Sequence, residues 1–529
     1  MKKYVLIFAL ICVGVAARAQ HFTPTQKLQF AEKVIETFYV DTVSSDKLVE
    51  EAIVAMLKTL DPHSAYSTPE ETRELNEPLQ GNFSGIGIQF NMATDTVYVI
   101  QTVAGGPSER VGILAGDRII AANDTVLAGR KMRTNAVMKH LRGPKGSEVK
   151  LTVVRRGVAE PIEFNVTRDD IPIYSVDASY MAAPGVGYVR ISRFAESTPE
   201  EVAEAIKKLS KQGMEDLIID LEDNGGGYMS AATDMAEMFL KKNDLLVFTK
   251  GRNMSPAYYR SHKDGSMKNG RVVVMVNQYS ASSSEILSGA IQDHDRGLIV
   301  GRRTFGKGLV QRPFPMPDGS MIRLTVSRYY TPSGRSIQKP YTDGDDDNYY
   351  LDMLHRYESG EMQNADSIHN NADELYYTLR NHRPVFGGGG ITPDVFVAVD
   401  TTGYSPYYRD IVAKGALIKY VTKYVDENRA TLTAQYPTAD DFIKKFKVSG
   451  DMLEGLSEAG KAEGVEPNSE QLETSKVPLT TAIKALVGRD IYKDDIYYQI
   501  YNEMNPVYQE ALRLITDKNR YDKILKGSK

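Results

Sequence analysis

A serine and a lysine, 25 residues apart, stand out as side chains that could do chemistry. Ser282 lies in the segment Asn277-Gln-Tyr-Ser-Ala-Ser-Ser-Ser-Glu285, where an apolar run gives way to a helical pattern. At the first turn of a helix, backbone N–H groups and the helix dipole favour developing negative charge, which suits a nucleophile. The spacing Ser282-x-x-Glu285 is also that of a capping box, which explains the serine without chemistry. From these residues alone both interpretations stay open.

The lysine lies in Gly301-Arg-Arg-Thr-Phe-Gly-Lys307-Gly308, which has the spacing of a phosphate-binding loop. Such a loop requires Ser or Thr after its lysine and then a helix whose N-terminus faces the phosphates. Here Gly308 follows, and Pro313 and Pro315 exclude a helix. The context therefore argues against a nucleotide site and leaves Lys307 for other chemistry.

A glycine run, Gly225-Gly226-Gly227, follows another apolar run and precedes another helical pattern. In a parallel sheet, this loop and the one before Ser282 emerge at the carboxyl ends of their strands. Glycine N–H groups there can complete an oxyanion hole with the amide of the residue after a nucleophile. A tight turn is the alternative use of three glycines.

These loops belong to residues 170–400, where predicted strands and helices alternate. We expect strands at 186–191, 217–221 and 271–276, and helices at 199–209, 230–240 and 283–293. Such alternation indicates an α/β domain with an at least partly parallel sheet. An acidic, tyrosine-rich insertion at residues 341–386 interrupts it and is interpreted as a lid, an interface or a mobile segment.

Residues 81–169 show short β-rich runs separated by glycines, with one helical segment at 135–141. The segment Phe83-Ser-Gly85-Ile86-Gly87-Ile88 and, later, Gly116-Asp117-Arg118-Ile119-Ile120 resemble the carboxylate-binding loop and the G-D-x-I motif of a PDZ domain. The resemblance implies that a peptide's terminal carboxylate binds at the loop Gly85, Ile86, Gly87 and Ile88, while the next strand offers an open edge for an added peptide strand.

Helical periodicity flanks these two regions. Residues 20–80 predict a small N-terminal helical cap, which contains the turn Leu60-Asp-Pro-His63, and residues 401–529 predict a C-terminal helical region. His63 lies beside a proline, so we interpret it as a turn residue rather than as a catalytic base.

Taken in order, several motifs are similar to those of the carboxyl-terminal processing (tail-specific) serine proteases. They are Leu60-Asp-Pro-His-Ser64, Ser280-Ala-Ser-x-Ser-Glu285, Thr304-Phe-Gly-Lys-Gly-x-Val-Gln311, Arg328-Tyr-Tyr-Thr-Pro-Ser-Gly334 and Gly390-Ile-Thr-Pro-Asp394. The resemblance covers roughly residues 25–400. It implies an α/β fold in which a crotonase/ClpP-like protease core carries an inserted PDZ domain, an N-terminal helical cap and a C-terminal helical region.

The resemblance also implies roles for individual residues. The nucleophile falls on Ser282, the general base on Lys307, the glutamine that supports the lysine on Gln311, and the oxyanion-hole amides on Gly226 and Ser283. A lysine with an ordinary pKa of about 10.4 must be neutral near pH 7 to act as a base, which costs roughly 4 to 5 kcal/mol and requires burial. No metal or organic cofactor is expected.

Two departures from the family pattern lie close to these residues. Glu222 occupies a position where the family commonly has arginine, so an anion replaces a cation near the glycine loop. Ser283 replaces a usual alanine, which matters less because only its backbone amide is required.

The first nineteen residues have the pattern of a signal peptide: Lys2 and Lys3, an apolar run, and Ala17-Arg18-Ala19 as a cleavage site. We therefore expect export to the periplasm of a bacterium. The single cysteine, Cys12, lies in this segment, so the mature chain has no thiol for a disulfide or a thiolate metal site. No later run is long and apolar enough for a transmembrane span.

The net charge of −5 gives no reason to expect a nucleic-acid partner. The expected partners are protein or peptide substrates bound through the C-terminus, and a homodimer or an adaptor complex stays open. Two other functions also stay open: a proteolytically silent PDZ scaffold that has lost activity through Glu222, and an acyl-CoA enzyme of the crotonase type.

Overall fold

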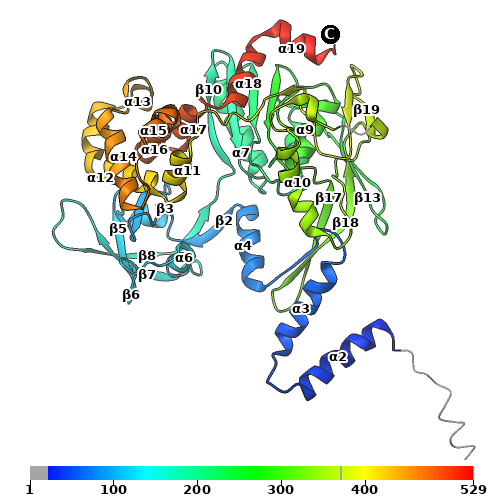
Figure 1. Ribbon diagram of the computed structural model, residues 1–529, viewed down its shortest axis with the longest axis horizontal. Helices are drawn as coiled ribbons and strands as arrows, with labels where there is room; N and C mark the ends of the chain where they lie inside the picture. The colour runs from blue at the N-terminus through cyan, green and yellow to red at the C-terminus, as the bar shows by residue number, and fades with distance from the viewer. Residues whose placement is uncertain (1–21, 370–371, 528–529) are drawn as a thin grey trace, which may run out of the picture. The chain divides into compact units, whose positions relative to one another are not determined.

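The computed structural model describes residues 22–369 and 372–527 (Figure 1). The predicted signal peptide, residues 1–19, lies outside the described residues. The chain divides into two compact units. Among the described residues, the first unit contains residues 22–69 together with Arg312–Thr325 and Tyr341–Tyr349, and the second contains the rest.

The first unit contains helices α2 (Pro24–Phe38) and α3 (Ser45–Leu57), as the periodicity predicted. Strand β1 (Ala65–Ser67) follows and pairs antiparallel with the first residues of β18 (Met321–Tyr330). His63 lies in the turn between α3 and β1. Its backbone N–H donates to Asp61 Oδ1 at 3.0 Å, and its ring Nε2 lies 2.9 Å from the Tyr349 hydroxyl. These contacts favour the interpretation of His63 as a turn residue.

In the second unit, residues 82–172 form the expected β-rich part. After α4 (Pro69–Gln80), β2 (Asn82–Gly85) pairs with β9 (Asp169–Pro172). Between them lie the elements β3 (Ile88–Asn91), β4 (Val97–Thr102), α5 (Pro107–Val111), β5 (Arg118–Ala122), β6 (Thr125–Val126), α6 (Thr134–Leu141), β7 (Glu148–Val154) and β8 (Ile162–Thr167). The strands form a sheet in the order β3-β4-β5-β7-β8, with β6 beside β5. Strand β3 is at the edge of this sheet, as expected for a strand that accepts a peptide.

The centre of the second unit is a six-stranded sheet in the order β10-β11-β12-β15-β16-β21. Strand β10 (Val176–Ala183) runs antiparallel to β11, whereas the other five strands are parallel: β11 (Val186–Ile191), β12 (Asp216–Asp220), β15 (Val272–Val276), β16 (Leu298–Gly301) and β21 (Val395–Phe396). Strands β12, β15 and β16 are buried throughout, which explains their continuous apolar sequences.

Helices cover both faces of this sheet (Figure 1). On one face, Leu217 and Ile219 share a core with helices α7 (Thr198–Ser210), α8 (Met229–Glu237) and α9 (Ser283–Asp293). On the other face, Ile218 packs with α18 (Pro506–Thr516) and α19 (Lys518–Leu525). The alternation follows from the two-residue period of a strand. The end of the C-terminal helical region is therefore a layer of the α/β core.

A smaller sheet combines β13 (Leu245–Lys250) and β14 (Ala257–Arg260) with the last residues of β18, while β17 (Leu309–Pro315) pairs with β18. The predicted insertion contains α10 (Asp346–Glu358), two short 3-10 turns (Ala365–Ser367 and Ala372–Glu374), β19 (Leu375–Tyr377) and β20 (Pro384–Phe386). Arg356 in α10 is 3% exposed and donates to the carbonyls of Thr304 (3.1 Å) and Arg303 (2.6 Å). This part of the insertion is packed against the segment that leads to Lys307.

Helices that share a separate apolar core form most of the C-terminal region. They are α11 (Pro406–Ala413), α12 (Ala416–Gln435), α13 (Ala439–Lys445), α14 (Gly450–Ala462), α15 (Ser469–Thr474), α16 (Lys476–Ile491) and α17 (Asp494–Tyr501). Within the described ranges, no helix combines the length and the apolar character that a membrane crossing requires.

Candidate active site

The loops that carry the predicted site emerge from three neighbouring parallel strands. Strands β12, β15 and β16 pair in parallel, so residues 221–228, 277–282 and 302–308 start at the same edge of the sheet. The loops are tied together: Ala281 N–H donates to Asn224 O at 3.0 Å, and Phe305 N–H donates to Ser280 O at 3.0 Å. The structure thus places the serine and glycine segments together, as the strand–loop–helix pattern predicted, and it adds the lysine segment, which follows β16 and precedes β17.

Ser282 precedes α9 in a strained conformation. Its φ is +56° and its ψ is −112°, whereas an ordinary N-cap residue lies in the β region. Non-glycine residues with such angles are costly and concentrate at functional sites. The Glu285 half of the predicted capping box is present, because Ser282 N–H donates to Glu285 Oε2 at 2.8 Å. The strain distinguishes Ser282 from a serine that serves only as a cap.

Glu285 connects the serine and the lysine segments. Its Oε2 accepts from the backbone N–H groups of Ser282 and Lys307, each at 2.8 Å, so these two nitrogens are at most about 5.6 Å apart. Its Oε1 accepts from Gly306 N–H at 2.7 Å and from the Thr304 hydroxyl at 2.5 Å. The side chain is fully buried, and burial raises the pKa of this carboxyl while the hydrogen bonds lower it. One carboxylate thus holds both backbones.

Tyr329 makes a second connection between the same two residues. Its hydroxyl donates toward Lys307 O at 2.6 Å and Ser282 O at 3.1 Å, and its side chain is 1% exposed. Tyr329 comes from β18, so a third element fixes the position of the serine relative to the lysine.

Lys307 and Gln311 meet as the resemblance implied. Lys307 Nζ donates to Gln311 Oε1 at 3.1 Å, and both side chains are partly buried. Lys307 lies just before β17, so a strand follows the lysine and the helix of a nucleotide-binding loop is absent here. The neighbouring Gly308 donates its N–H to Gln338 Oε1 at 2.8 Å, and a Cβ at this position would lie 2.9 Å from Gln338 N. Glycine is required here by close packing.

The glycine loop lies directly against the serine. Gly226 has a φ of +102°, and a Cβ there would lie 2.8 Å from the Ser282 Cβ and 3.0 Å from the Ser283 N. The structure thereby places Gly226 directly beside Ser283, the two residues predicted to supply the oxyanion-hole amides. The Gly226 N–H, however, donates to Asn224 Oδ1 at 2.8 Å. A buried N–H needs a partner, and Asn224 supplies it in this conformation.

The predicted carboxylate-binding loop precedes the edge strand β3. Gly85, Ile86 and Gly87 are buried, and Gly87 has a φ of +71°, which favours glycine. The carbonyls of Ile86 and Gly87 accept from Ser108 and Val103, each at 3.0 Å. Ile88, the last residue of the loop, begins β3.

Sequence reasoning did not assign Glu285, Tyr329 or Thr304 a part in the site. Glu285 was expected only as half of a capping box, and Tyr329 stood unassigned in the motif Arg328-Tyr-Tyr330. The sequence signal that could have pointed to these three residues is that each lies in one of the family-like motifs that also contain Ser282 and Lys307 or follow them along the chain. Within the described part of the chain, no group of three or more His, Cys, Asp or Glu side chains is placed to hold a metal ion.

Comparison with known proteins identifies four segments. Residues 185–346 match the model of peptidase family S41, and residues 84–177 match that of the PDZ domain. Residues 14–72 match the N-terminal domain of the activating protease CtpB, and residues 407–494 match a family of unknown function.

Curated relatives are similar over the larger part of their length. A carboxy-terminal-processing protease of Bartonella bacilliformis is 35% identical over 309 residues, which cover 58% of this chain and 70% of the relative. The carboxy-terminal processing protease CtpA of Bacillus subtilis is 33% identical over 344 residues, covering 63% of this chain and 73% of the relative. Among solved structures, the photosystem II D1 C-terminal processing protease is 30% identical, with a TM-score of 0.33 over 60% of this chain and 91% of that one.

Proposed function

Since the chain belongs to the carboxy-terminal processing proteases of peptidase family S41, we propose that it is an exported serine endopeptidase with a Ser282–Lys307 dyad. The expected fold class is confirmed: a protease core of this family with a PDZ domain, N-terminal helices and a C-terminal helical region. The observation that carries the dyad is the buried Glu285 carboxylate, whose Oε2 accepts from the backbone N–H groups of both residues.

In the proposed reaction, Ser282 Oγ attacks the carbonyl carbon of the scissile peptide bond while its proton moves to Lys307 Nζ. The C–N bond then breaks, and the lysine returns the proton to the leaving amine. Water attacks the resulting ester and releases the acid, which regenerates the serine. Gln311 orients the amine without adding charge, as their hydrogen bond of 3.1 Å allows.

The oxyanion of each tetrahedral intermediate is assigned to the amides of Ser283 and Gly226. The Gly226 N–H has to exchange Asn224 Oδ1 for the substrate oxygen, since it donates to Asn224 at 2.8 Å here. We propose that productive substrate binding includes this exchange.

Substrate selection is assigned to the PDZ domain, with the terminal carboxylate of a protein substrate at Gly85–Ile88 and its chain added to the edge of β3. The edge position of β3 and the left-handed Gly87 support this role.

Export to the periplasm rests on the signal-like residues 1–19. A homodimer or an adaptor complex is supported by apolar side chains of α2 that are exposed, such as Phe30 (58%) and Phe38 (79%).

The test is cleavage of an unstructured polypeptide by the purified mature protein, followed by mass spectrometry. We expect Ser282→Ala and Lys307→Ala to abolish cleavage, whereas Ser288→Ala, a matched serine change inside the helix that follows Ser282, retains it. Amidation of the substrate C-terminus should weaken recognition without changing the cleaved bond.

Tight binding of the C-terminus without any cleavage would instead identify a silent PDZ scaffold. Hydrolysis of an acyl-CoA thioester that survives Ser282→Ala would place the chain with crotonase-type enzymes.

A further inference from the structure

Glu222 lies where the family resemblance led us to expect arginine, and its surroundings show how the chain accommodates the change. It comes two residues after β12 and two residues before Asn224, whose side chain holds the Gly226 amide. The side chain is 7% exposed, and its backbone N–H donates to Asp220 Oδ1 at 2.8 Å. Glu222 is thus part of the ordered base of the glycine loop.

The partner of its carboxylate comes from the far end of the chain. Asn505, between α17 and α18, donates through Nδ2 to Glu222 Oε2 at 2.7 Å. The Oδ1 of the same side chain accepts from Val507 N–H at 2.9 Å and caps α18. Because α18 packs against β12, β15 and β16, Asn505 is held by the core of the sheet. Both ends of the Asn505 amide are used, one for its helix and one for the glycine loop.

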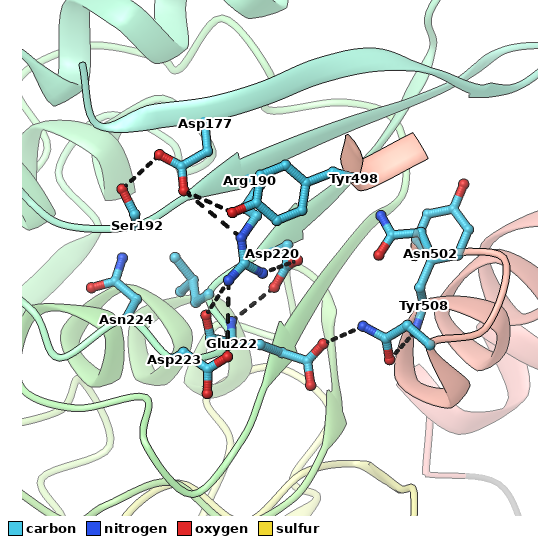
Figure 2. A network of polar contacts seen from close by, with 12 residues as sticks. Asp177, Arg190, Ser192, Asp220, Glu222, Asp223, Asn224, Tyr498, Asn502 and Tyr508 are labelled. Carbon is cyan, nitrogen blue, oxygen red and sulfur yellow. Dashed lines mark hydrogen bonds and ion pairs between the residues drawn. The ribbon is translucent and has the colours of Figure 1, made fainter. Parts of the chain in front are cut away.

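Two arginines place positive charge near Glu222. Arg190 donates to Asp220 Oδ2 at 2.7 Å and to Glu222 O at 3.2 Å, and Figure 2 shows it between Asp177 and Asp220. Arg302 Nη2 lies 3.7 Å from Glu222 Oε1. Glu222 is therefore a central member of a charged network and not an isolated buried anion.

The network continues to the proposed oxyanion loop. Asp223 and Asn277 exchange two hydrogen bonds, of 3.1 and 2.8 Å, which join the glycine loop to the segment before Ser282. Asn224 donates to Ile191 O at 2.8 Å and accepts from Gly226 N–H at 2.8 Å. Glu222 therefore lies four residues before Gly226, in a segment whose intervening residues are hydrogen-bonded to Asn277 and Ile191.

We propose that Glu222 is a positioning residue which, through its hydrogen bond with Asn505, ties the glycine loop to the C-terminal helices and so sets the position of the Gly226 amide beside Ser282. This inference rests on the proposed protease function. It assigns the end of the chain a part in catalysis as well as in packing.

The hydrogen bond between Asn505 and Glu222, called the tie below, depends on pH. Burial, and next the negative charge of Asp220, raise the pKa of Glu222 to about 7. A cavity of about 450 Å³ opens on Glu222 and gives protons access. Above pH 7 the carboxylate is charged, so its hydrogen bond from Asn505 becomes charge-assisted and the tie tightens. The charged or titratable side chains around Glu222, on the neighbouring strands and in the cavity wall, are Asp220, Arg190, Asp223, Arg302, Asp400, Tyr404, Tyr497, Tyr498 and Tyr501.

Asn505→Asp separates the tie from the helix cap, because aspartate still caps α18 but presents a carboxylate to Glu222 in place of a donor. At pH 8 we expect kcat to fall about tenfold while KM stays within about twofold of the wild type. The reason is that loss of a charge-assisted hydrogen bond misplaces the Gly226 amide, which contacts the substrate oxygen in the transition state. At pH 6 the loss should be smaller, because a protonated Glu222 can donate to the introduced aspartate.

A second substitution reverses the polarity of the contact. In the double variant E222Q/N505D, the glutamine amide can donate to the aspartate, and we expect kcat at pH 8 to return to within about threefold of the wild type. Asn468→Asp, the same change at the exposed N-cap of α15, is the matched control and should leave kcat unchanged.

Hydrogen exchange of residues 221–228 in the full chain provides a readout that does not depend on cleavage. Exchange should speed up in N505D and slow again in the double variant. An unchanged kcat and exchange rate in N505D, or a loss that the double variant does not reverse, would overturn the inference. A wild-type protein that cleaves nothing would refute the proposed function, while the exchange data would still test the tie.

Discussion

Replacing Tyr329 by phenylalanine tests whether the serine and lysine segments are held together as the structure indicates. The change removes a single oxygen atom, whose contacts to Lys307 O (2.6 Å) and Ser282 O (3.1 Å) bridge the two residues. The ring itself belongs to the main apolar core and keeps its packing. The substitution therefore perturbs position and leaves the core volume almost unchanged.

The expected magnitude follows from the burial of these groups. A net hydrogen bond contributes about 0.5 to 1.5 kcal/mol, and an unsatisfied buried carbonyl costs about 1 to 3 kcal/mol. We expect the free energy of unfolding to fall by about 1 to 2 kcal/mol. If a similar amount of positioning energy is lost in the transition state, kcat falls about tenfold.

Steady-state cleavage of a quenched fluorescent peptide and urea denaturation measure the two quantities. Tyr330→Phe is the matched control, since neighbouring strand residues point to opposite faces and Tyr330 stacks on Phe248 with ring centroids 5.0 Å apart. A Tyr329→Phe protein with kcat within twofold of the wild type, or a Tyr330→Phe protein with the same loss, would refute the reasoning.

Three further predictions concern the loops around the site. Gly226→Ala should lower kcat at least about 100-fold, because the new Cβ would meet Ser282. Gly213→Ala is the control: Gly213 has a φ of +91° and no atom within 4 Å of the new Cβ, so the variant carries the same backbone strain without the clash and should retain kcat. Arg356→Ala leaves two buried carbonyls and Glu361 short of a partner, so urea denaturation should show that the free energy of unfolding falls by about 3 to 5 kcal/mol. Arg513→Ala, which breaks an exposed ion pair, is the control and should lower it by less than about 1 kcal/mol. The folded state holds the Glu222 proton up to a pKa of about 7, against 4.5 ordinarily, so the stability that this proton contributes is present below pH 4.5 and is lost as the pH rises through 7. About 2 kcal/mol should be lost between pH 5 and pH 7.5, and denaturation of Glu222→Gln at these two pH values should lack that loss, whereas an unchanged pH slope would contradict the assignment.

Local patterns predicted the elements of the core closely. The strand at 186–191 and the helix at 283–293 have the predicted bounds, because continuous apolar runs and helical periodicity are properties of neighbouring residues. The same patterns placed Ser282 at a strand–helix junction and Gly226 at another. The insertion at 341–386 was left open between three interpretations, since its acidic composition says nothing about the contact of Arg356 with Thr304.

The role of the C-terminal helices could not be predicted from their periodicity. An amphipathic pattern shows that α18 buries one face, but not that this face covers the sheet that carries the site. A homodimer or adaptor surface was as consistent with the sequence as an internal layer.

The sequence by itself determined which side chains we assign to the proposed hydrolysis and on which strand ends and helix starts they lie, because both depend on residue type and short-range spacing. Only the tertiary structure decided which polar groups hold them in place. Glu285 meets Lys307 across 22 residues, Tyr329 meets Ser282 across 47, and Asn505 meets Glu222 across 283. These residues pair because segments that pack together bury polar groups, and each buried donor needs an acceptor. Which segments pack together depends on residues far apart in the sequence, so no local pattern predicts the pairs.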